Sequence, residues 1–391
     1  MPRDQTETFP PIPFRFSFAE LSGSLGDLGT FLPLVIAMVV TFQDRGQLLD
    51  LGVILFFAGL MNVLTGFIFR QPIPVQPMKA IAAVAIAEGL TTGELAASGI
   101  LMGIILVFVT FSGTIDTITK WIPRPIVRGI QLGVGLKLGF KGAQMIAGLE
   151  IGGWDGRVVG AVITIVFLIM MWKRIPGLLI MFVAGFGILF ISNQQAYHDL
   201  AFRWPDFQFI VPSWAEWRGG FEKGTLPQLP LTLLNSVVAV CALSGDYFPK
   251  HAIPPRRMAL SVGMMNLIVC PFGGMPMCHG SGGLAAQYEF GARTGASVIM
   301  LGISKMVVGL FLGSTILQLL STYPRSIIAI MLIVAGVGLA KAARDCLTGE
   351  AFFIVFMTAV FSLQPNNTAI GFLAGVITFL ALRIRKRFVR A

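Results

Sequence analysis

The chain has 391 residues, of which 55% are hydrophobic and only 12% charged, and its formal net charge is +10. Soluble globular proteins carry about 25% charged residues, so this composition argues against a soluble enzyme, a disordered chain and a disulfide scaffold. We expect a polytopic membrane protein that is not an enzyme. In a membrane protein, the positions of the basic residues first indicate how the chain is oriented across the membrane. Binding of a polyanionic partner is the second interpretation.

The first half of the chain is predicted to cross the membrane seven times. A spanning helix needs about 20 mostly apolar residues, and several segments before position 193 come close to that length or are apolar but interrupted. They cover residues 18–40, 51–69, 72–89, 95–115, 125–148, 158–172 and 177–192. A polar, Pro-rich N-terminal tail, residues 1–17, precedes them and has no signal-peptide pattern.

The second half repeats this organisation after a polar loop at 193–228, whose Trp204, Trp214 and Trp217 suggest a membrane interface. Its apolar segments cover residues 229–247, 258–270, 271–291, 297–322, 326–340 and the two halves of 351–382. A basic tail, residues 383–391, follows. The expected fold is an all-α polytopic membrane protein with about 14 transmembrane segments. Because each half has an odd number of spans, 18–192 and 229–382 would form two inverted repeats.

The distribution of positive charge agrees with this count. If both termini are cytoplasmic, most of the 29 Lys and Arg residues fall on the cytoplasmic side, as the positive-inside rule requires. We therefore expect a multi-pass protein of the cytoplasmic (plasma) membrane with its N- and C-termini inside.

The third segment of each half is broken by proline and glycine. Pro72, Pro74 and Pro77 favour an extended backbone, and the alanine-rich run behind them predicts a helix that starts near Met78. The segment that begins at Pro271 has the same form, with a Gly-rich stretch before its helix. Interrupted segments at matching places in two halves indicate the binding site of a transporter built from inverted repeats.

The chemistry of these segments suits an anion. The N-terminus of a helix carries about +0.5 charge and N–H groups without intrahelical partners. Two such ends and Lys79 would supply about +2, which balances a dianion. The alternative is that both breaks are simple kinks in packed helices.

Ionisable groups inside spans are candidates for function because they are costly to insert. Asp27 lies mid-span beside Ser24 and Thr30, and His279 and Glu289 lie in the tenth segment. We consider Asp27, His279 and Glu289 possible proton carriers, and structural pairing is the alternative for each. The remaining lysines within spans, Lys137, Lys141 and Lys305, are interpreted as structural.

Glycines 133, 135 and 139 are interpreted as helix-packing positions, because no phosphate-loop motif accompanies them. An ATP-driven pump is therefore disfavoured. The four cysteines have no zinc-type spacing, and we expect no metal and no cofactor.

Three stretches carry a resemblance to a known family. They are Glu20 to Leu34 (ELSGSLGDLGTFLPL), Pro74 to Lys79 (PVQPMK) and Met275 to Arg293 (MPMCHGSGGLAAQYEFGAR). Together they resemble the signature stretches of the molybdate transporter family, a branch of the sulfate-permease superfamily. The resemblance covers nearly the whole chain. Typical sulfate permeases carry a cytoplasmic regulatory domain after the last span, and the resemblance to the molybdate branch implies that no such domain is expected here.

The resemblance implies a core domain that moves against a gate domain, with the anion between the third and tenth spans and near the first and eighth. Members of the superfamily often form dimers, so a homodimer in the lipid bilayer is expected, with no nucleic-acid partner. The positions implied for the substrate are Ser24, Asp27, Thr30, Gln76, Pro77, Met78, Lys79, Asn235, Ser236, Cys278, His279, Gly280 and Ser281.

The expected function is secondary active import of molybdate by alternating access. A sulfate or other oxyanion transporter of the same fold is the first alternative, because sulfate has the same charge and shape. A nucleobase permease is disfavoured, since the middle of the eighth span has no acidic residue. A passive anion channel is the alternative from a different class.

Overall fold

The computed structural model describes residues 10–25, 28–115, 117, 123–172, 177–192, 204–321, 323–364 and 368–390, which are mostly helical. The first half contains α1 (Phe18–Leu25), α2 (Leu28–Asp44), α3 (Leu51–Phe69), β1 (Val75–Pro77), α4 (Lys79–Glu88), α5 (Thr92–Phe111), α7 (Arg124–Ala147), α8 (Arg157–Trp172) and α9 (Gly177–Ser192). The second half contains α10 (Trp214–Gly219), η2 (Gly220–Thr225), α11 (Leu226–Leu231), η3 (Thr232–Ala239), α12 (Val240–Tyr247), η4 (Pro249–His251), α13 (Pro255–Val269), η5 (Cys270–Phe272), β2 (Met277–His279), α14 (Ser281–Glu289), α15 (Ala296–Ser321), α16 (Arg325–Ala340), η6 (Lys341–Cys346), α17 (Gly349–Ser362) and α18 (Thr368–Arg390).

Helix starts follow local capping chemistry. Asp50 accepts hydrogen bonds from the backbone N–H groups of Gly52 and Val53 at 2.7 and 3.1 Å, which fixes the start of α3. Thr91 and Glu94 form a reciprocal capping box at the start of α5. Within the described part of the chain, five helices are long and apolar enough to cross a membrane, α3 and α5 among them.

Two predicted boundaries differ from the structure. The polar segment 193–228 was expected to be a loop, but a continuous helix runs from Trp214 to Tyr247. Ser213 caps this helix, and its π-helical turns at η2 and η3 accommodate Pro227 and Pro230, which lack the N–H of a regular turn. The second is the end of the last helix: the basic residues after 382 continue α18 as far as Arg390.

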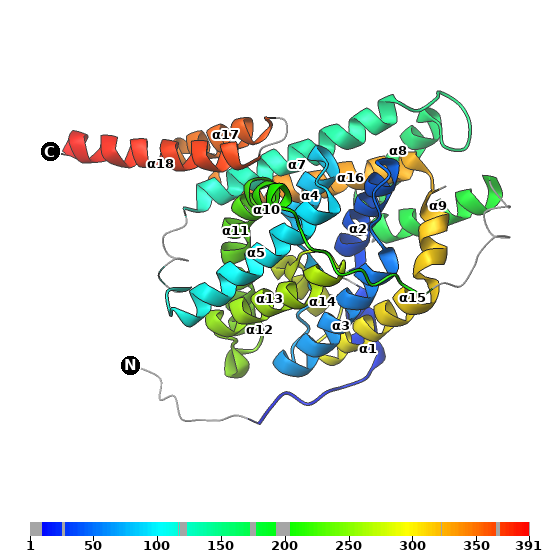
Figure 1. The fold of residues 1–391 in the computed structure, drawn as a ribbon, viewed down its shortest axis with the longest axis horizontal. Coiled ribbons are helices and arrows are strands. Elements are labelled where there is room, and N and C mark those ends of the chain that lie inside the picture. Colours follow the sequence, from blue (N-terminus) through cyan, green and yellow to red (C-terminus); the bar gives the residue numbers. More distant parts are fainter. Residues whose placement is uncertain are drawn as a thin grey trace.

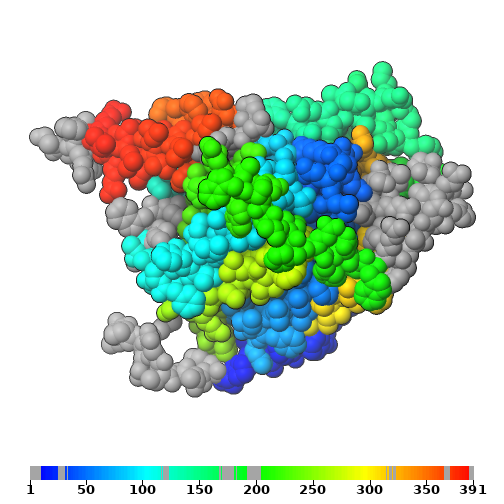
Figure 2. Space-filling model, in the orientation of Figure 1, coloured from blue at the N-terminus to red at the C-terminus, as the bar shows by residue number. Residues whose placement is uncertain are grey.

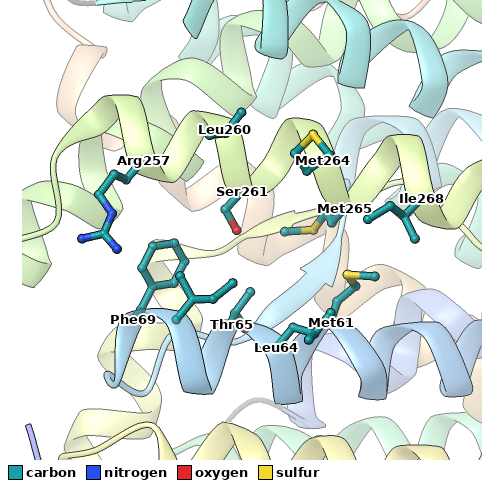
Figure 3. Close-up of a pocket in the computed structure, with 11 residues that line it drawn as sticks. Met61, Leu64, Thr65, Phe69, Arg257, Leu260, Ser261, Met264, Met265 and Ile268 are labelled. Carbon is teal, nitrogen blue, oxygen red and sulfur yellow. The ribbon is translucent and has the colours of Figure 1, made fainter. Parts of the chain in front are cut away.

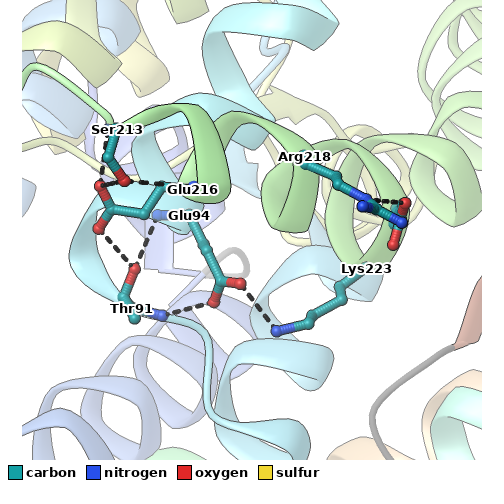
Figure 4. Close-up of polar contacts among 7 residues, drawn as sticks. Thr91, Glu94, Ser213, Glu216, Arg218 and Lys223 are labelled. Atoms are coloured by element: carbon teal, nitrogen blue, oxygen red, sulfur yellow. Dashed lines mark hydrogen bonds and ion pairs between the residues drawn. The ribbon is translucent and has the colours of Figure 1, made fainter.

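Polar contacts fasten the start of this long helix to α5 (Figure 4). Lys223 forms an ion pair with Glu94 at 2.7 Å, and the hydroxyl of Thr91 donates to Glu216 at 2.9 Å. Glu216 also accepts a hydrogen bond from the backbone N–H of Ser213. These contacts pair charged side chains whose burial would be costly without partners.

An extended segment, residues 204–213, crosses the face of the molecule between α15 and α10 (Figures 1 and 2). Trp204 packs against Phe311 of α15, and Phe207 packs against Phe56 and Phe57 of α3. The N–H of Ile210 donates to the carbonyl of Pro271 at 2.8 Å. The segment therefore packs against α15, α3 and η5.

The helices form two groups that pack side by side (Figure 1). The core bundle contains both strands and pairs α3 with α15, α5 with α13 and α1 with α14. The flanking bundle pairs α7 with α16, α7 with α17 and α17 with α18. Contacts between the bundles are made by α2 with α16, α4 with α7 and α11 with α18.

Glycines allow the closest of these helix pairs to approach. In α3, a Cβ on Gly59 would lie 2.4 Å from the carbonyl oxygen of Gly302 in α15, and a Cβ on Gly302 would lie 2.5 Å from that of Gly59. Between α7 and α16, Gly135 and Gly336 show the same relation at 2.5 and 2.4 Å. The packing role predicted for Gly133 and Gly135 is thus confirmed, whereas a Cβ on Gly139 would meet nothing within 4 Å.

Substitution of these glycines should separate packing from helix propensity. Alanine favours a helix by about 1 kcal/mol over glycine, so Gly139→Ala should leave the thermal unfolding midpoint unchanged or raise it. Gly59→Ala should lower the midpoint, because the added methyl would force α3 and α15 apart at a cost of about 1–3 kcal/mol. Thermal unfolding in detergent, followed by size exclusion, measures both. Equal midpoints for the two variants would contradict the packing account.

Candidate functional site

The two broken segments meet in a short antiparallel pairing at the centre of the core bundle. Val75 lies opposite His279, Gln76 opposite Cys278 and Pro77 opposite Met277. The N–H of Met78 then donates to the carbonyl of Pro276 at 2.9 Å. The prolines prevent these residues from forming a helix, so the two segments satisfy each other's backbone instead.

Two buried asparagines anchor the strands. Asn62 of α3 accepts a hydrogen bond from the N–H of Val75 at 2.8 Å. Asn266 of α13 accepts one from the N–H of Met277 at 2.9 Å and donates to the carbonyl of the same residue at 2.7 Å. Both asparagines are fully buried. Sequence reasoning missed them, although an amide side chain within an apolar helix was the available signal.

Each strand leads directly into a helix. Helix α4 begins at Lys79, one residue after the start expected at Met78, and α14 begins at Ser281. Because the strands are antiparallel and only three residues long, the two helices leave from opposite ends of the pairing, and the last strand residues before them, Pro77 and His279, lie about 7 Å apart along the strands. Both helix N-termini therefore lie next to the pairing, as the sequence pattern indicates.

The two N-termini are not equivalent. Gln228 of α11 is buried, and its Oε1 accepts from the N–H groups of Ala80 at 2.9 Å and Ile81 at 3.4 Å, so the protein itself occupies part of the α4 N-terminus. Among the described side chains, none caps α14. Gly282 in its first turn is exposed, and a Cβ there would meet nothing within 4 Å. The α14 N-terminus thus opens onto free space.

Polar groups from the π-helical turn η3 border this opening. The hydroxyl of Ser281 donates to Oδ1 of Asn235 at 2.7 Å. Ser236 is buried beside the thiol of Cys278. A π-helical turn shifts the side chains that follow it relative to a regular helix, and such turns are frequent at functional sites.

Lys79 is half-buried at the first position of α4, and its charge is near enough to act on the Cys278 thiol. Among the described residues, no acidic side chain forms an ion pair with it. The Lys79 ammonium can therefore bind an anion that comes from outside the chain.

Gln76 explains why position 280 is glycine. Gln76 is buried, and a Cβ on Gly280 would lie only 2.0 Å from its Oε1. Pro77 and Met78 are buried as well and contribute backbone to the turn that starts α4. The glycine therefore leaves room for the Gln76 amide beside the strand pair.

His279 points to the other face of the strand pair. Its Nδ1 lies 3.2 Å from the carbonyl oxygen of Pro74, and its Nε2 lies 3.0 Å from the hydroxyl of Ser261. A carbonyl only accepts, so Nδ1 carries the proton and the Ser261 hydroxyl donates to Nε2. The ring also packs edge-on against Phe69 at 5.7 Å. Both nitrogens are thus occupied by the protein.

The remaining predicted positions are placed as follows. Ser24 is buried at the end of α1, which packs against α14, and its hydroxyl donates to the carbonyl of Leu21 at 2.6 Å. Asp27 and the side chain of Thr30 lie outside the described residues. Glu289 is exposed at the far end of α14.

An apolar groove of about 280 Å³ lies between α3 and α13, behind His279 (Figure 3). Ser261 and Phe69 form part of its wall, Met61 and Met264 line it, and Arg257 lies at one end. With one cation and a mostly apolar wall, this groove does not have the donors that an oxyanion needs. The opening at α14 is therefore the better candidate for an anion.

Loss of a strand anchor should destabilise the pairing. Asn266→Leu keeps the volume but leaves the N–H and carbonyl of Met277 without their partner, which costs about 1–3 kcal/mol for each buried group. We expect a lower thermal unfolding midpoint, measured in detergent, with Ser304→Ala on the exposed face of α15 as the control. An unchanged midpoint in Asn266→Leu would show that the anchor is dispensable.

Comparison with known proteins shows the family to which the chain is similar. A family profile described as "Molybdate transporter of MFS superfamily" matches residues 19–138 and 220–339. The chain is 38% identical to Molybdate transporter 2 of Arabidopsis thaliana, over 94% of this chain and 88% of the plant protein. It is 39% identical to Molybdate transporter 1 of the same plant, over 95% and 90%, and 31% identical to Molybdate transporter 1 of Chlamydomonas reinhardtii, over 94% and 92%.

Solved structures show the fold. The transmembrane domain of the cyanobacterial bicarbonate transporter BicA superposes with a TM-score of 0.65 at 16% identity, covering 94% of this chain and 99% of that one. Murine Solute Carrier 26 family member A9, an anion transporter in the inward-facing state, superposes with a TM-score of 0.69 at 14% identity, covering 96% and 69%. The architecture is thus a helical membrane transporter fold of this type.

Proposed function

The chain belongs to the molybdate transporter family, and we propose that it is a secondary active transporter that imports molybdate, a tetrahedral oxyanion, by alternating access. It is an integral multi-pass membrane protein, and its relatives are transporters and not enzymes. The observation that carries the proposal is the uncapped N-terminus of α14, which opens onto free space at Gly282, together with the half-buried Lys79, whose charge acts on Cys278 three residues before α14.

Charge balance supports a dianion in this opening. The open N-terminus of α14 contributes about +0.5 and Lys79 a full positive charge, while α4 contributes part of its +0.5 because Gln228 already uses two of its N–H groups. The sum of nearly +2 matches molybdate. N–H groups of a helix start and a lysine are also the donors that tetrahedral oxyanions take.

The proposed site comprises the positions that border the opening and the strand pair, with Asp27 and Thr30 retained from the sequence. They are Ser24, Asp27, Thr30, Gln76, Pro77, Met78, Lys79, Asn235, Ser236, Cys278, Gly280 and Ser281. We assign His279 to positioning β2, since both of its nitrogens have protein partners. Asp27 and Glu289 remain the proposed proton carriers.

We infer further that the two halves are inverted repeats of seven spans. An inverted repeat relates the second span (α3) to the ninth (α13), and the fourth span (α5) to the eleventh (α15). It therefore maps the contact of α3 with α15 onto that of α13 with α5, and both contacts are present. The contact of α1 with α14 has its counterpart in that of α11 with α4. Movement of the core bundle against the flanking bundle would then provide alternating access.

Both termini are proposed to be cytoplasmic, in the plasma membrane, with a homodimer as the expected assembly. The positive-inside distribution supports the orientation.

Sulfate is the alternative substrate, because its charge and shape are the same. We expect proteoliposomes that contain the purified protein to accumulate molybdate, measured by elemental analysis, and unlabelled molybdate to compete better than sulfate. Collapse of the proton gradient should abolish accumulation against a concentration gradient, which separates a coupled carrier from a channel. Robust sulfate uptake without molybdate uptake would contradict the proposal.

Removal of the lysine charge should weaken anion binding. Lys79→Met keeps most of the side-chain volume but removes a charge from a partly desolvated site, where one charge-assisted contact is worth about 1.5–3 kcal/mol, or roughly 10-fold to 100-fold in affinity. Equilibrium binding of molybdate to purified protein measures this loss. Lys341→Met, which changes an exposed lysine of η6, is the control and should bind normally. Unchanged affinity in Lys79→Met would remove Lys79 from the site.

A further inference from the structure

A buried ion pair joins the core bundle to the flanking bundle. Glu88, the last residue of α4, pairs with Lys137 in the middle of α7, and their side chains are only 4% and 9% exposed. Lys137 also donates to the carbonyl of Gln364 at 3.1 Å. Separation of this pair costs free energy, because each charge would remain buried without a partner unless water or another ion takes the partner's place.

A pocket of about 340 Å³ lies directly beside this pair. Glu88, Lys137, Lys141 and Gln144 supply its polar lining. Two lysines against one carboxylate leave the pocket with a net positive charge. It lies at the far end of α4 from Lys79, about 15 Å away along this ten-residue helix.

A second contact between the bundles lies at the same end. Asp44, the last residue of α2, pairs with Arg325 at the start of α16 at 3.1 Å. The guanidinium of Arg45 donates to the carbonyls of Ala85 and Ile86, so the ends of α2 and α4 are neighbours. In the described part of the chain, the ion pairs that connect the two bundles both lie here.

The other ion pairs of the flanking bundle remain inside it. Arg128 of α7 pairs with Asp345 of η6 at 2.7 Å, and Lys386 of α18 pairs with Glu350 of α17 at 2.6 Å. A shift of one bundle against the other would leave these pairs intact but would separate Glu88 from Lys137.

We propose that Glu88 and Lys137 form the extracytoplasmic gate of the transporter, and that the pocket with Lys137 and Lys141 is the access path of the oxyanion. The pair holds the bundles together in the closed arrangement. An incoming dianion supplies the counter-charge that the lysines lose when Glu88 moves away, so it stabilises the open arrangement more than the closed one. This proposal rests on the function proposed above and adds the residues that control access.

Accessibility of a reporter cysteine tests the gate without a transport assay. The native cysteines are buried, so Gly282→Cys, in the open space at the start of α14, provides the reactive thiol. A membrane-impermeant thiol reagent is applied from the extracytoplasmic side of right-side-out vesicles. In this background we compare Glu88→Gln, Lys137→Met, the double variant that leaves neither charge, and Asp345→Asn as the control within the flanking bundle.

The double variant should label about tenfold faster than the Gly282→Cys parent, because the closed arrangement has lost the pair that holds it. Glu88→Lys combined with Lys137→Glu should restore the slow rate, and Asp345→Asn should not change it. The double variant leaves no lone buried charge, so it remains informative if a single variant fails to fold. An unchanged rate in the double variant, or acceleration only from the cytoplasmic side, would overturn the gate.

The labelling result is independent of the substrate. Faster labelling in a protein that does not transport molybdate would retain the gate and reject the proposed substrate. Normal molybdate uptake with unchanged labelling would retain the substrate and reject the gate.

Discussion

The three-residue pairing of β1 with β2 is the constraint on which the rest of the core depends. Extended backbone in the interior of a membrane protein is tolerated only where its polar groups are satisfied by protein or line a cavity. Each strand pairs with the other, and a buried asparagine, Asn62 for β1 and Asn266 for β2, supplies further partners. A side chain at position 280 would displace the buried Gln76 amide, and the two helix starts lie beside the pairing.

The same constraint makes the two halves of the site unequal. Gln228 satisfies part of the α4 N-terminus, whereas α14 starts beside open space at Gly282. An anion therefore has most to gain from α14 and from the charge of Lys79. The inequality is consistent with a substrate that must bind and leave again, since two fully open helix ends would hold a dianion more tightly.

Proline and glycine patterns predicted the broken segments, and apolar length predicted α3 at Leu51–Phe69. The start of the helix Trp214–Tyr247 was missed because residues 214–228 are rich in polar residues, Gly and Pro, and they become helical through capping by Ser213 and contacts with α5. Gln228 lies 148 residues from Ala80 along the chain, so no local pattern could reveal its role. Alternation along β2 could have shown that Cys278 and His279 face opposite sides. The buried Glu88 was likewise not recognised as a partner of Lys137.

The most direct test of the central claim is to locate the bound anion. A structure of the purified protein with molybdate, in which molybdenum is identified by anomalous scattering, measures its position. We predict a peak within hydrogen-bonding distance of the first N–H groups of α14 and within reach of Lys79. A peak only at Lys141 or beside Arg257, with none at the start of α14, would contradict the account.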